Sequence, residues 1–302
     1  MDTIFITNDS RRAQVAEQAG VDRVMVDLEI IGKGERQRNF DTLISRHSLS
    51  DVNRLRPVLK RALLMVRINP MHDYARDEVD ACTAAGADIL MLPMISHPAE
   101  ARQFVQIVGG RSKTCLLLET GAALARLRDI ISVPGIDEVH IGLNDLHLAL
   151  KLDFMFEVVS GGLIEYIAQT IRDRGLRFGI GGIARLGRGL VSPELILSEH
   201  VRLGSSQVIL SRDYNRIFDE CGEELIVGVF QREIKELQRC VQQVRNLGSQ
   251  LQAINSRKLK CAVDEIVGLR VDGLSTAVEG SGSQGRSPGS LKEIADTCNG
   301  RP

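Results

Sequence analysis

The chain has 302 residues, a length that suits one large domain or two ordinary ones. Hydrophobic residues make up 43% of it and charged residues 25%, which is typical of a globular protein in water. The 38 Lys and Arg residues nearly cancel the 39 Asp and Glu, so the formal net charge is -1. This balance argues against a dedicated nucleic-acid-binding protein, which would carry a basic surface.

The sequence shows no segment that would direct the chain to a membrane or out of the cell. No apolar run is long enough to cross a bilayer, and the N-terminal residues MDTIFITNDSRR differ from a secretory signal. The six cysteines are scattered and form no C-x-x-C pair, so neither a zinc site nor a disulfide framework is expected. These features predict a reduced, cytoplasmic protein of enzyme size.

Short aliphatic runs alternate with amphipathic segments along the first 215 residues. The amphipathic segments have helical periodicity, and several end at a glycine. Eight runs predict strands, over residues 3–7, 23–29, 62–68, 88–92, 114–119, 137–142, 177–182 and 207–211. Such regular alternation predicts a (β/α)8 TIM barrel. A doubly wound open sheet is the main alternative, although it rarely needs eight strands in such succession.

The alternation of aliphatic runs and amphipathic segments ends after the eighth run. Residues 222–247 predict one long amphipathic helix, which could cap the barrel or contact another subunit. Its expected apolar side contains Leu225, Val229, Ile234, Leu237, Val241 and Val244. We therefore expect a catalytic barrel over residues 1–220, a helical extension over 221–275 that forms an oligomer contact, and a tail over 276–302. The Gly/Ser-rich composition of EGSGSQGRSPGS predicts that this tail is disordered.

Charged residues follow the apolar runs at the ends where a barrel carries its active site. They are Asp27, Glu29, Arg67, Glu119 and Asp145. Converging carboxylates repel one another unless a cation or a shared proton intervenes, and ligand sets made of oxygen favour Mg²⁺ or Mn²⁺ over zinc. An arginine beside such a metal can stabilise a developing oxyanion. The constellation suits enolate chemistry, in which a 2-oxo acid chelates the metal and a metal-stabilised enolate forms as a C–C bond breaks or forms.

The run LLLETGAALARLRDIISVPGIDEVHIGLNDLHLAL (116–150) resembles the signature of the HpcH/HpaI aldolase and citrate lyase beta-subunit superfamily. VDLE (26–29), VRIN (66–69) and MLPM (91–94) match its other strand-end motifs in order and spacing. The resemblance implies a pyruvate- or phosphoenolpyruvate-type TIM barrel that forms homo-oligomers. It also implies a metal-dependent lyase of the class II type, either an aldehyde-lyase or an oxo-acid-lyase, acting on a 2-oxo acid, hydroxy acid or acyl thioester.

The resemblance also implies a role for each matching residue. Glu119 and Asp145 correspond to the metal-binding carboxylates, and Arg67 to the arginine that contacts the keto or enolate oxygen. Asp27 and Glu29 match acidic positions that support the metal site or take part in catalysis. The backbone that would bind the substrate carboxylate belongs to Gly142, Leu143 and Asn144.

The chain departs from the family pattern in the residues expected to transfer a proton. Hydroxy-acid aldolases of this group have a histidine directly after Asp-x-Glu, where this chain has Ile30. His47, in the long segment that follows, could replace it, and His147 is a weaker candidate. The second acidic residue of the lyase branch is absent here, and Gly-Pro of the aldolases is Gly142-Leu143. The metal and enolate half of the site is thus expected, whereas the proton-transfer residue and the substrate stay open.

Two other functions fit the same barrel. One is a phosphoenolpyruvate-handling transferase, and the other is a non-catalytic metal-binding barrel, which Ile30 motivates. In each case we expect a small-molecule ligand and neither nucleic acid nor membrane as a partner.

Some residues admit a structural interpretation beside a functional one. The glycine run over 179–189 matches neither a Walker loop nor a dinucleotide fingerprint, and it predicts a tight turn near the substrate. Arg185 and Arg188 could contact an anionic substrate tail or be solvated rim charges. His97 and His200 are expected at the surface of helices, while His140 is either a core residue or a catalyst.

Overall fold

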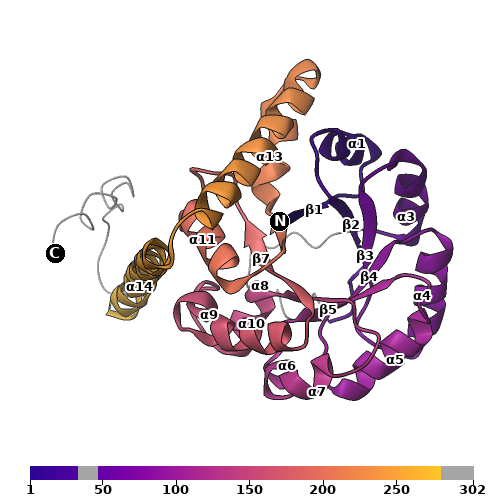
Figure 1. Ribbon diagram of the computed structural model, residues 1–302, viewed down its shortest axis with the longest axis horizontal. Coiled ribbons are helices and arrows are strands. Elements are labelled where there is room, and N and C mark those ends of the chain that lie inside the picture. Colours follow the sequence, from indigo (N-terminus) through magenta and orange to yellow (C-terminus); the bar gives the residue numbers. More distant parts are fainter. Residues whose placement is uncertain (33–46, 280–302) are drawn as a thin grey trace.

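The computed structural model describes residues 1–32 and 47–279. Its strands are all parallel and close into a barrel in chain order, β1 to β8 (Figure 1). The strands are Asp2–Ile6 (β1), Arg23–Asp27 (β2), Leu63–Arg67 (β3), Ile89–Leu92 (β4), Lys113–Leu118 (β5), Glu138–Ile141 (β6), Arg177–Ile183 (β7) and Gln207–Leu210 (β8). Each overlaps one predicted run, so the (β/α)8 barrel is confirmed.

Helices cover the outside of the barrel (Figure 1). α5 illustrates how the sequence sets their ends, because His97 and Glu100 form a capping box at its start and Gly109, at φ +59°, ends it. The helices are Ser10–Gln18 (α1), Leu49–Leu55 (α3), Ala75–Ala84 (α4), Pro98–Val108 (α5), Gly121–Ala125 (α6), Leu127–Ile131 (α7), Leu143–Ala149 (α8), Glu157–Ser160 (α9), Leu163–Asp173 (α10), Pro193–Leu203 (α11), Ile217–Glu220 (α12), Glu223–Arg245 (α13) and Ser249–Glu279 (α14), with short 3₁₀ turns at Arg56–Val58 and Arg212–Tyr214.

Side chains inside the barrel form a cluster separate from the larger core between strands and helices. This inner cluster contains Ile4, Met25, Met65, Ile89, Met91, Cys115 and Leu117. Along a barrel strand, every second side chain points inward. The next inward positions after Met25, Met65 and Leu117 are therefore Asp27, Arg67 and Glu119. The alternation of the strands thus brings three charged residues to the carboxyl end of the barrel, directly above an apolar layer.

The opposite end of the barrel is closed by buried polar groups that pair with one another. The Arg23 guanidinium pairs with Glu138 through NH1 and with Asp2 Oδ2 through NH2 at 2.9 Å. The Gln207 amide donates to Glu138 Oε2 at 2.8 Å. Buried charges are tolerated when they are paired and hydrogen-bonded in this way. The charges at this end therefore stabilise the fold, and the charged residues at the carboxyl end are the candidates for a functional site.

The glycines of β7 have a packing role, and the turn expected in this run lies just after the strand, where the Arg188 N–H donates to the Arg185 carbonyl at 3.0 Å. A Cβ atom at Gly179 would lie 2.7 Å from His140 Cε1, and one at Gly181 would lie 2.8 Å from Leu143 Cδ1. The strand has no side chains at these positions, so the ring of His140 and the side chain of Leu143 can lie against its backbone.

α13 confirms the predicted long helix but buries a slightly different side. Leu225 is 66% exposed and Val229 is half-buried, whereas Ile226 and Phe230 are buried. A period of 3.6 residues places 226 and 230 in line with Ile234, which explains the shift. The Phe230 ring meets Phe5 edge-on, with 5.3 Å between ring centroids, so α13 closes the helical ring against the barrel.

α14 lies beside α9 and α11 and extends away from the barrel (Figure 1). Leu259 and Val263 are its buried contacts. The domain boundary at residue 220 and the oligomer contact stay predictions. Most of the predicted tail, residues 280–302, lies outside the described residues, while 276–279 belong to α14. Within the described ranges, no helix is both long and apolar enough to cross a membrane.

Candidate active site

Arg67 is held at the carboxyl end of the barrel by two acidic residues, one at the end of the neighbouring strand β2 and one just after it. Asp27 pairs with Arg67 in the β2–β3 ladder, and its carboxylate accepts from Nε at 2.8 Å and from NH2 at 2.7 Å. Glu29 Oε2 lies 3.5 Å from Arg67 NH1. Burial alone would lower the pKa of Arg67, but the charges of Asp27 and Glu29 raise it. The guanidinium is therefore a fixed cation with a set orientation.

Glu119 follows β5 and is 3% exposed. Its Oε1 accepts a hydrogen bond of 3.0 Å from the backbone N–H of Met94. Met94 has φ +54°, a left-handed conformation that costs free energy in a residue with a side chain. Burial, and then the charge of Asp145, raise the pKa of Glu119 to about 8, while Arg67 opposes the shift. When no metal ion is bound, the carboxyl group therefore holds its proton at neutral pH.

Asp145 approaches Glu119 from the first turn of α8. The turn fits closely over Glu119, because a Cβ atom at Gly142 would lie 2.7 Å from Glu119 Oε2 and 2.9 Å from Glu119 Cβ. The side chain of Leu143 is buried in the apolar core, so this residue can offer its main chain alone to a ligand at the mouth of the barrel. Asn144 is half-buried on the same turn. The structure therefore brings together the predicted metal and substrate-binding positions.

Glu119 and Asp145 have the chemistry of a site for a hard divalent cation. Their carboxylates are close enough that the charge of one raises the pKa of the other, and a cation between them would remove this repulsion. No cluster of three or more His, Cys, Asp or Glu side chains suited to a metal occurs within residues 1–32 and 47–279. A pair of carboxylates is nevertheless sufficient for Mg²⁺, which usually keeps several waters or substrate oxygens. The residues present thus fit the expected metal.

His47 lies at the end of β2, where its Nδ1 accepts a hydrogen bond of 3.0 Å from the backbone N–H of Asp27. A neutral ring with an accepting Nδ1 carries its proton on Nε2. To accept a further proton at Nδ1, the ring would have to give up this hydrogen bond. The geometry therefore favours His47 as a contact that orients Asp27 rather than as a general base.

The other buried histidines are structural. His140 donates from Nε2 to the Gly181 carbonyl at 3.0 Å, and burial, with the charges of Arg23 and Arg67, lowers its pKa to about 4. His147 lies on α8 and is buried, and its Nδ1 donates to the Leu143 carbonyl at 3.2 Å. Both imidazoles are thus held by main-chain carbonyls within the fold.

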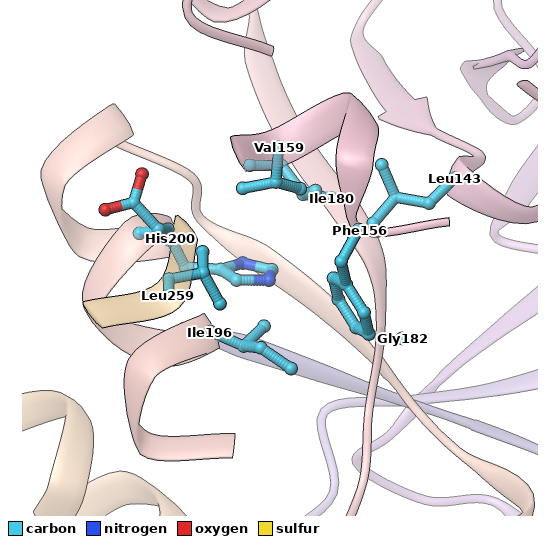
Figure 2. A pocket seen from close by; sticks show the side chains of 9 residues that line it. Leu143, Phe156, Val159, Ile180, Gly182, Ile196, His200 and Leu259 are labelled. Atoms are coloured by element: carbon cyan, nitrogen blue, oxygen red, sulfur yellow. The ribbon is translucent and has the colours of Figure 1, made fainter. Parts of the chain in front are cut away.

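His200 is not the surface residue that was expected, because it is 1% exposed. Ser205 Oγ donates to the Gln207 carbonyl at 3.2 Å, so the 3.0 Å contact with His200 leaves Nδ1 as the donor. The ring points into a small apolar cavity that Phe156 and Leu259 help to line (Figure 2). Burial, and then His140, lower the pKa of His200 to about 3. The ring is therefore neutral, and it extends from α11 into a cavity that Leu259 of α14 also lines.

Arg185 and Arg188, which follow β7, are engaged by acidic residues of the C-terminal helices. Arg185 is buried and pairs with Glu220 at 2.9 Å and with Glu233 at 2.7 Å. Arg188 NH1 lies 3.2 Å from Glu220. These contacts favour a structural role over contact with a substrate tail.

Two residues that shape the site carry weak sequence signals. Met94 and Asn69 end the motifs MLPM and VRIN, but their residue types do not indicate chemistry. Met94 orients Glu119 through its backbone, and Asn69 accepts hydrogen bonds from Ile30 and Ile31. The left-handed backbone of Met94 and the bridging amide of Asn69 can be recognised only from the positions of their hydrogen-bond partners in the folded chain.

Comparisons with known proteins identify the family and the fold of the chain. The family model described as HpcH/HpaI aldolase/citrate lyase matches residues 5–157. The chain belongs to this family. A search of curated proteins finds no match. Membership supports a lyase or aldolase activity, and the family generally depends on a divalent metal.

Solved structures show the same fold at low sequence identity. An HpcH/HpaI aldolase from Desulfitobacterium hafniense DCB-2 aligns with TM-score 0.54 and 14% identity over 82% of this chain and 94% of its own. An HpcH/HpaI aldolase/citrate lyase family protein from Burkholderia cenocepacia J2315 aligns with TM-score 0.57 and 14% identity, over 79% and 93%. The citrate synthase SbnG aligns with TM-score 0.55 and 16% identity, over 78% and 93%. At this identity the likeness establishes the barrel fold of this family member and leaves its substrate open.

Proposed function

We propose that this family member is a divalent-metal-dependent carbon–carbon lyase or aldolase that acts through the enolate of a 2-oxo acid, hydroxy acid or acyl thioester. Glu119 and Asp145 would hold Mg²⁺ or Mn²⁺. The observation that carries the proposal is the coupled carboxylate pair next to a fixed guanidinium, all at the carboxyl end of the barrel. The bound cation would offset the charge of both carboxylates and polarise the oxygens of a chelating substrate.

Arg67 is the residue that we assign to the developing oxyanion. Asp27 occupies Nε and NH2, which leaves the NH1 edge, with its 3.5 Å contact to Glu29, to face a substrate oxygen. A planar donor that is already oriented stabilises negative charge without reorganisation during the reaction. The backbone of Gly142, Leu143 and Asn144 would bind the substrate carboxylate.

Glu29 is our candidate for proton transfer. It is buried, contacts Arg67, and contributes with Asp145 to the raised pKa of Glu119, so it faces the reacting region. His47 is the less favoured candidate, because its Nδ1 accepts the Asp27 N–H. Both carboxylate oxygens of Asp27 accept hydrogen bonds from Arg67, so Asp27 would contribute by orienting the guanidinium.

The cellular setting is part of the proposal. The cysteines within residues 1–32 and 47–279 are free thiols, which supports a reducing, cytoplasmic compartment. A homo-oligomer contact through the C-terminal helices, as the family resemblance implies, is also part of the proposal. The substrate is a small molecule.

Calorimetry on metal-stripped protein tests the metal site. We expect Mn²⁺ to bind with release of a proton near pH 7, because the pKa of Glu119 is about 8. The measured enthalpy should then differ between PIPES and Tris buffers, which differ in their enthalpy of protonation. Glu119→Gln and Asp145→Asn should weaken Mn²⁺ binding by about 100-fold or more. The control is Asp129→Asn, which changes an exposed acid on α7. Wild-type protein that binds no Mn²⁺ would contradict the proposal.

Solvent exchange of the methyl protons of pyruvate, followed by NMR in D₂O, tests the enolate half of the reaction. We expect exchange that requires Mn²⁺ and is lost in Arg67→Ala. Metal binding without exchange and without 2-oxo acid binding would favour a non-catalytic barrel. Metal-dependent binding of phosphoenolpyruvate in place of pyruvate would favour the transferase.

A further inference from the structure

Asn69 joins the segment that follows β2 to the start of α4. Its Oδ1 accepts from the backbone N–H groups of Ile30 at 2.9 Å and Ile31 at 3.1 Å. Its Nδ2 donates to Glu78 Oε1 at 2.9 Å, and its backbone N–H lies 3.2 Å from the same oxygen. The Asn69 side chain thus accepts hydrogen bonds from the segment after β2 and donates one to α4, and so connects two segments at the carboxyl end of the barrel.

The turn at Ile30 and Ile31 needs such an anchor because it has little apolar burial of its own. Ile30 is 61% exposed and Ile31 is 43% exposed. Hydrophobic contacts therefore contribute little to holding the backbone here. Glu29, the residue just before this turn, carries the carboxylate that faces Arg67 NH1.

Glu78 decides which way the amide of Asn69 points. A carboxylate accepts hydrogen bonds and cannot donate them, so the NH₂ group must face Glu78 and the oxygen must face Ile30 and Ile31. Glu78 is held in turn by His72, whose Nε2 lies 3.1 Å from Glu78 Oε2. The Nδ1 of His72 accepts from the Tyr74 N–H at 3.2 Å, which places the ring proton on Nε2.

We propose that Asn69 is a positioning residue for the enolate half-site: by bridging Glu78 to the Ile30–Ile31 turn, it sets the place of Glu29 against Arg67. The inference rests on the proposed function for its catalytic consequence. Asp27 fixes one edge of the guanidinium directly, and Asn69 fixes the other edge through the backbone that carries Glu29.

Reversing the polarity of the Asn69–Glu78 hydrogen bond tests this role. Asn69→Asp sets two carboxylates against each other, whereas Asn69→Asp combined with Glu78→Gln restores a donor, now on residue 78. We expect the rate of Mn²⁺-dependent pyruvate proton exchange to fall about tenfold or more in Asn69→Asp and Asn69→Ala. The double variant should recover to within about threefold of wild type, with Mn²⁺ affinity unchanged throughout. The matched control is Asn53→Asp, an exposed residue on α3.

A second measurement does not depend on catalysis. Amide hydrogen exchange at Ile30 and Ile31 should quicken about tenfold or more in Asn69→Ala, and the ¹⁵Nε resonance of Arg67 should shift. The double variant should return the Arg67 resonance toward its wild-type position. Asn69→Ala with unchanged amide exchange and an unchanged Arg67 resonance would overturn the inference, as would a double variant without recovery. If wild-type protein exchanges no pyruvate protons, the proposed function fails while these resonances still decide the role of Asn69.

Discussion

The carboxyl group of Glu119 shows how strongly the surroundings of one residue set its chemistry. Its burial and the nearby charge of Asp145 raise its pKa to about 8, although the charge of Arg67 and the hydrogen bond from the N–H of a strained Met94 oppose the shift. Gly142 is what permits this placement, because any side chain there would collide with Glu119. The proposed metal site therefore depends on a residue that has no functional group.

Replacing Gly142 tests that dependence. Gly142→Ala places a methyl group 2.7 Å from Glu119 Oε2, so we expect Mn²⁺ affinity to fall about 10- to 100-fold, because the ligand must move. Titration calorimetry measures the change. Gly121→Ala is the control, since a Cβ atom at Gly121 meets no atom within 4 Å. Equal Mn²⁺ affinity in both variants would show that the close approach is not needed.

At the level of elements, β7 differs from its neighbours because its inward positions lack side chains. Gly179 pairs in register with His140 on β6, and the ring fills the space that a side chain of β7 would take. Within β7 the glycines therefore serve to pack a histidine inside the barrel, and the turn predicted in this run lies after the strand, at Leu186 and Gly187.

Gly179→Ala is expected to destabilise the protein. The new methyl group would overlap the His140 ring and lie 2.9 Å from Gln207 Cβ, and overpacking of this kind costs about 1–3 kcal/mol. Gly228→Ala in α13 has open space around its Cβ position and should instead stabilise by about 0.5–1 kcal/mol. Urea unfolding of both variants measures the two free energies. A stability for Gly179→Ala equal to wild type would refute the packing argument.

For the whole molecule, burial of two histidines makes folding sensitive to pH. The pKa values of His140 and His200 fall from 6.5 to about 4 and about 3, so the folded chain keeps both rings neutral. The unfolded chain takes up these protons below about pH 6.5. Their contribution to stability is complete above that pH and is lost as the pH falls toward the folded values.

His140 and His200 should therefore each reduce the free energy of unfolding by about 1.4 kcal/mol per pH unit as the pH falls from about 6 to 4.5. His200→Asn should remove about half of this combined slope. His97→Asn is the control, because His97 is exposed and asparagine also suits its position at the start of α5. Urea unfolding at pH 7, 6, 5 and 4.5 gives the slopes. An unchanged slope in His200→Asn would contradict the assignment.

The order of the strands and most of the candidate site could be predicted from the sequence. Alternating aliphatic runs and amphipathic segments predicted the barrel, because each element must bury one side. Asp27, Arg67 and Glu119 were recognisable because charges at the ends of apolar strands are hard to explain as packing, and parallel strands bring their carboxyl ends to one place. Family motifs at residues 116–150 added Asp145 and predicted the chemistry.

The tertiary structure decided how those residues interact. Which nitrogen of His47 accepts, which atoms of Arg67 donate to Asp27, and why Gly142 must be a glycine depend on neighbours from different strands. His200 looked like a surface residue because helical periodicity does not reveal that α14 covers it. The pattern of a sequence reports which side of an element is buried. Hydrogen-bond direction and pKa depend on distances between segments far apart in the chain, and folding alone sets those.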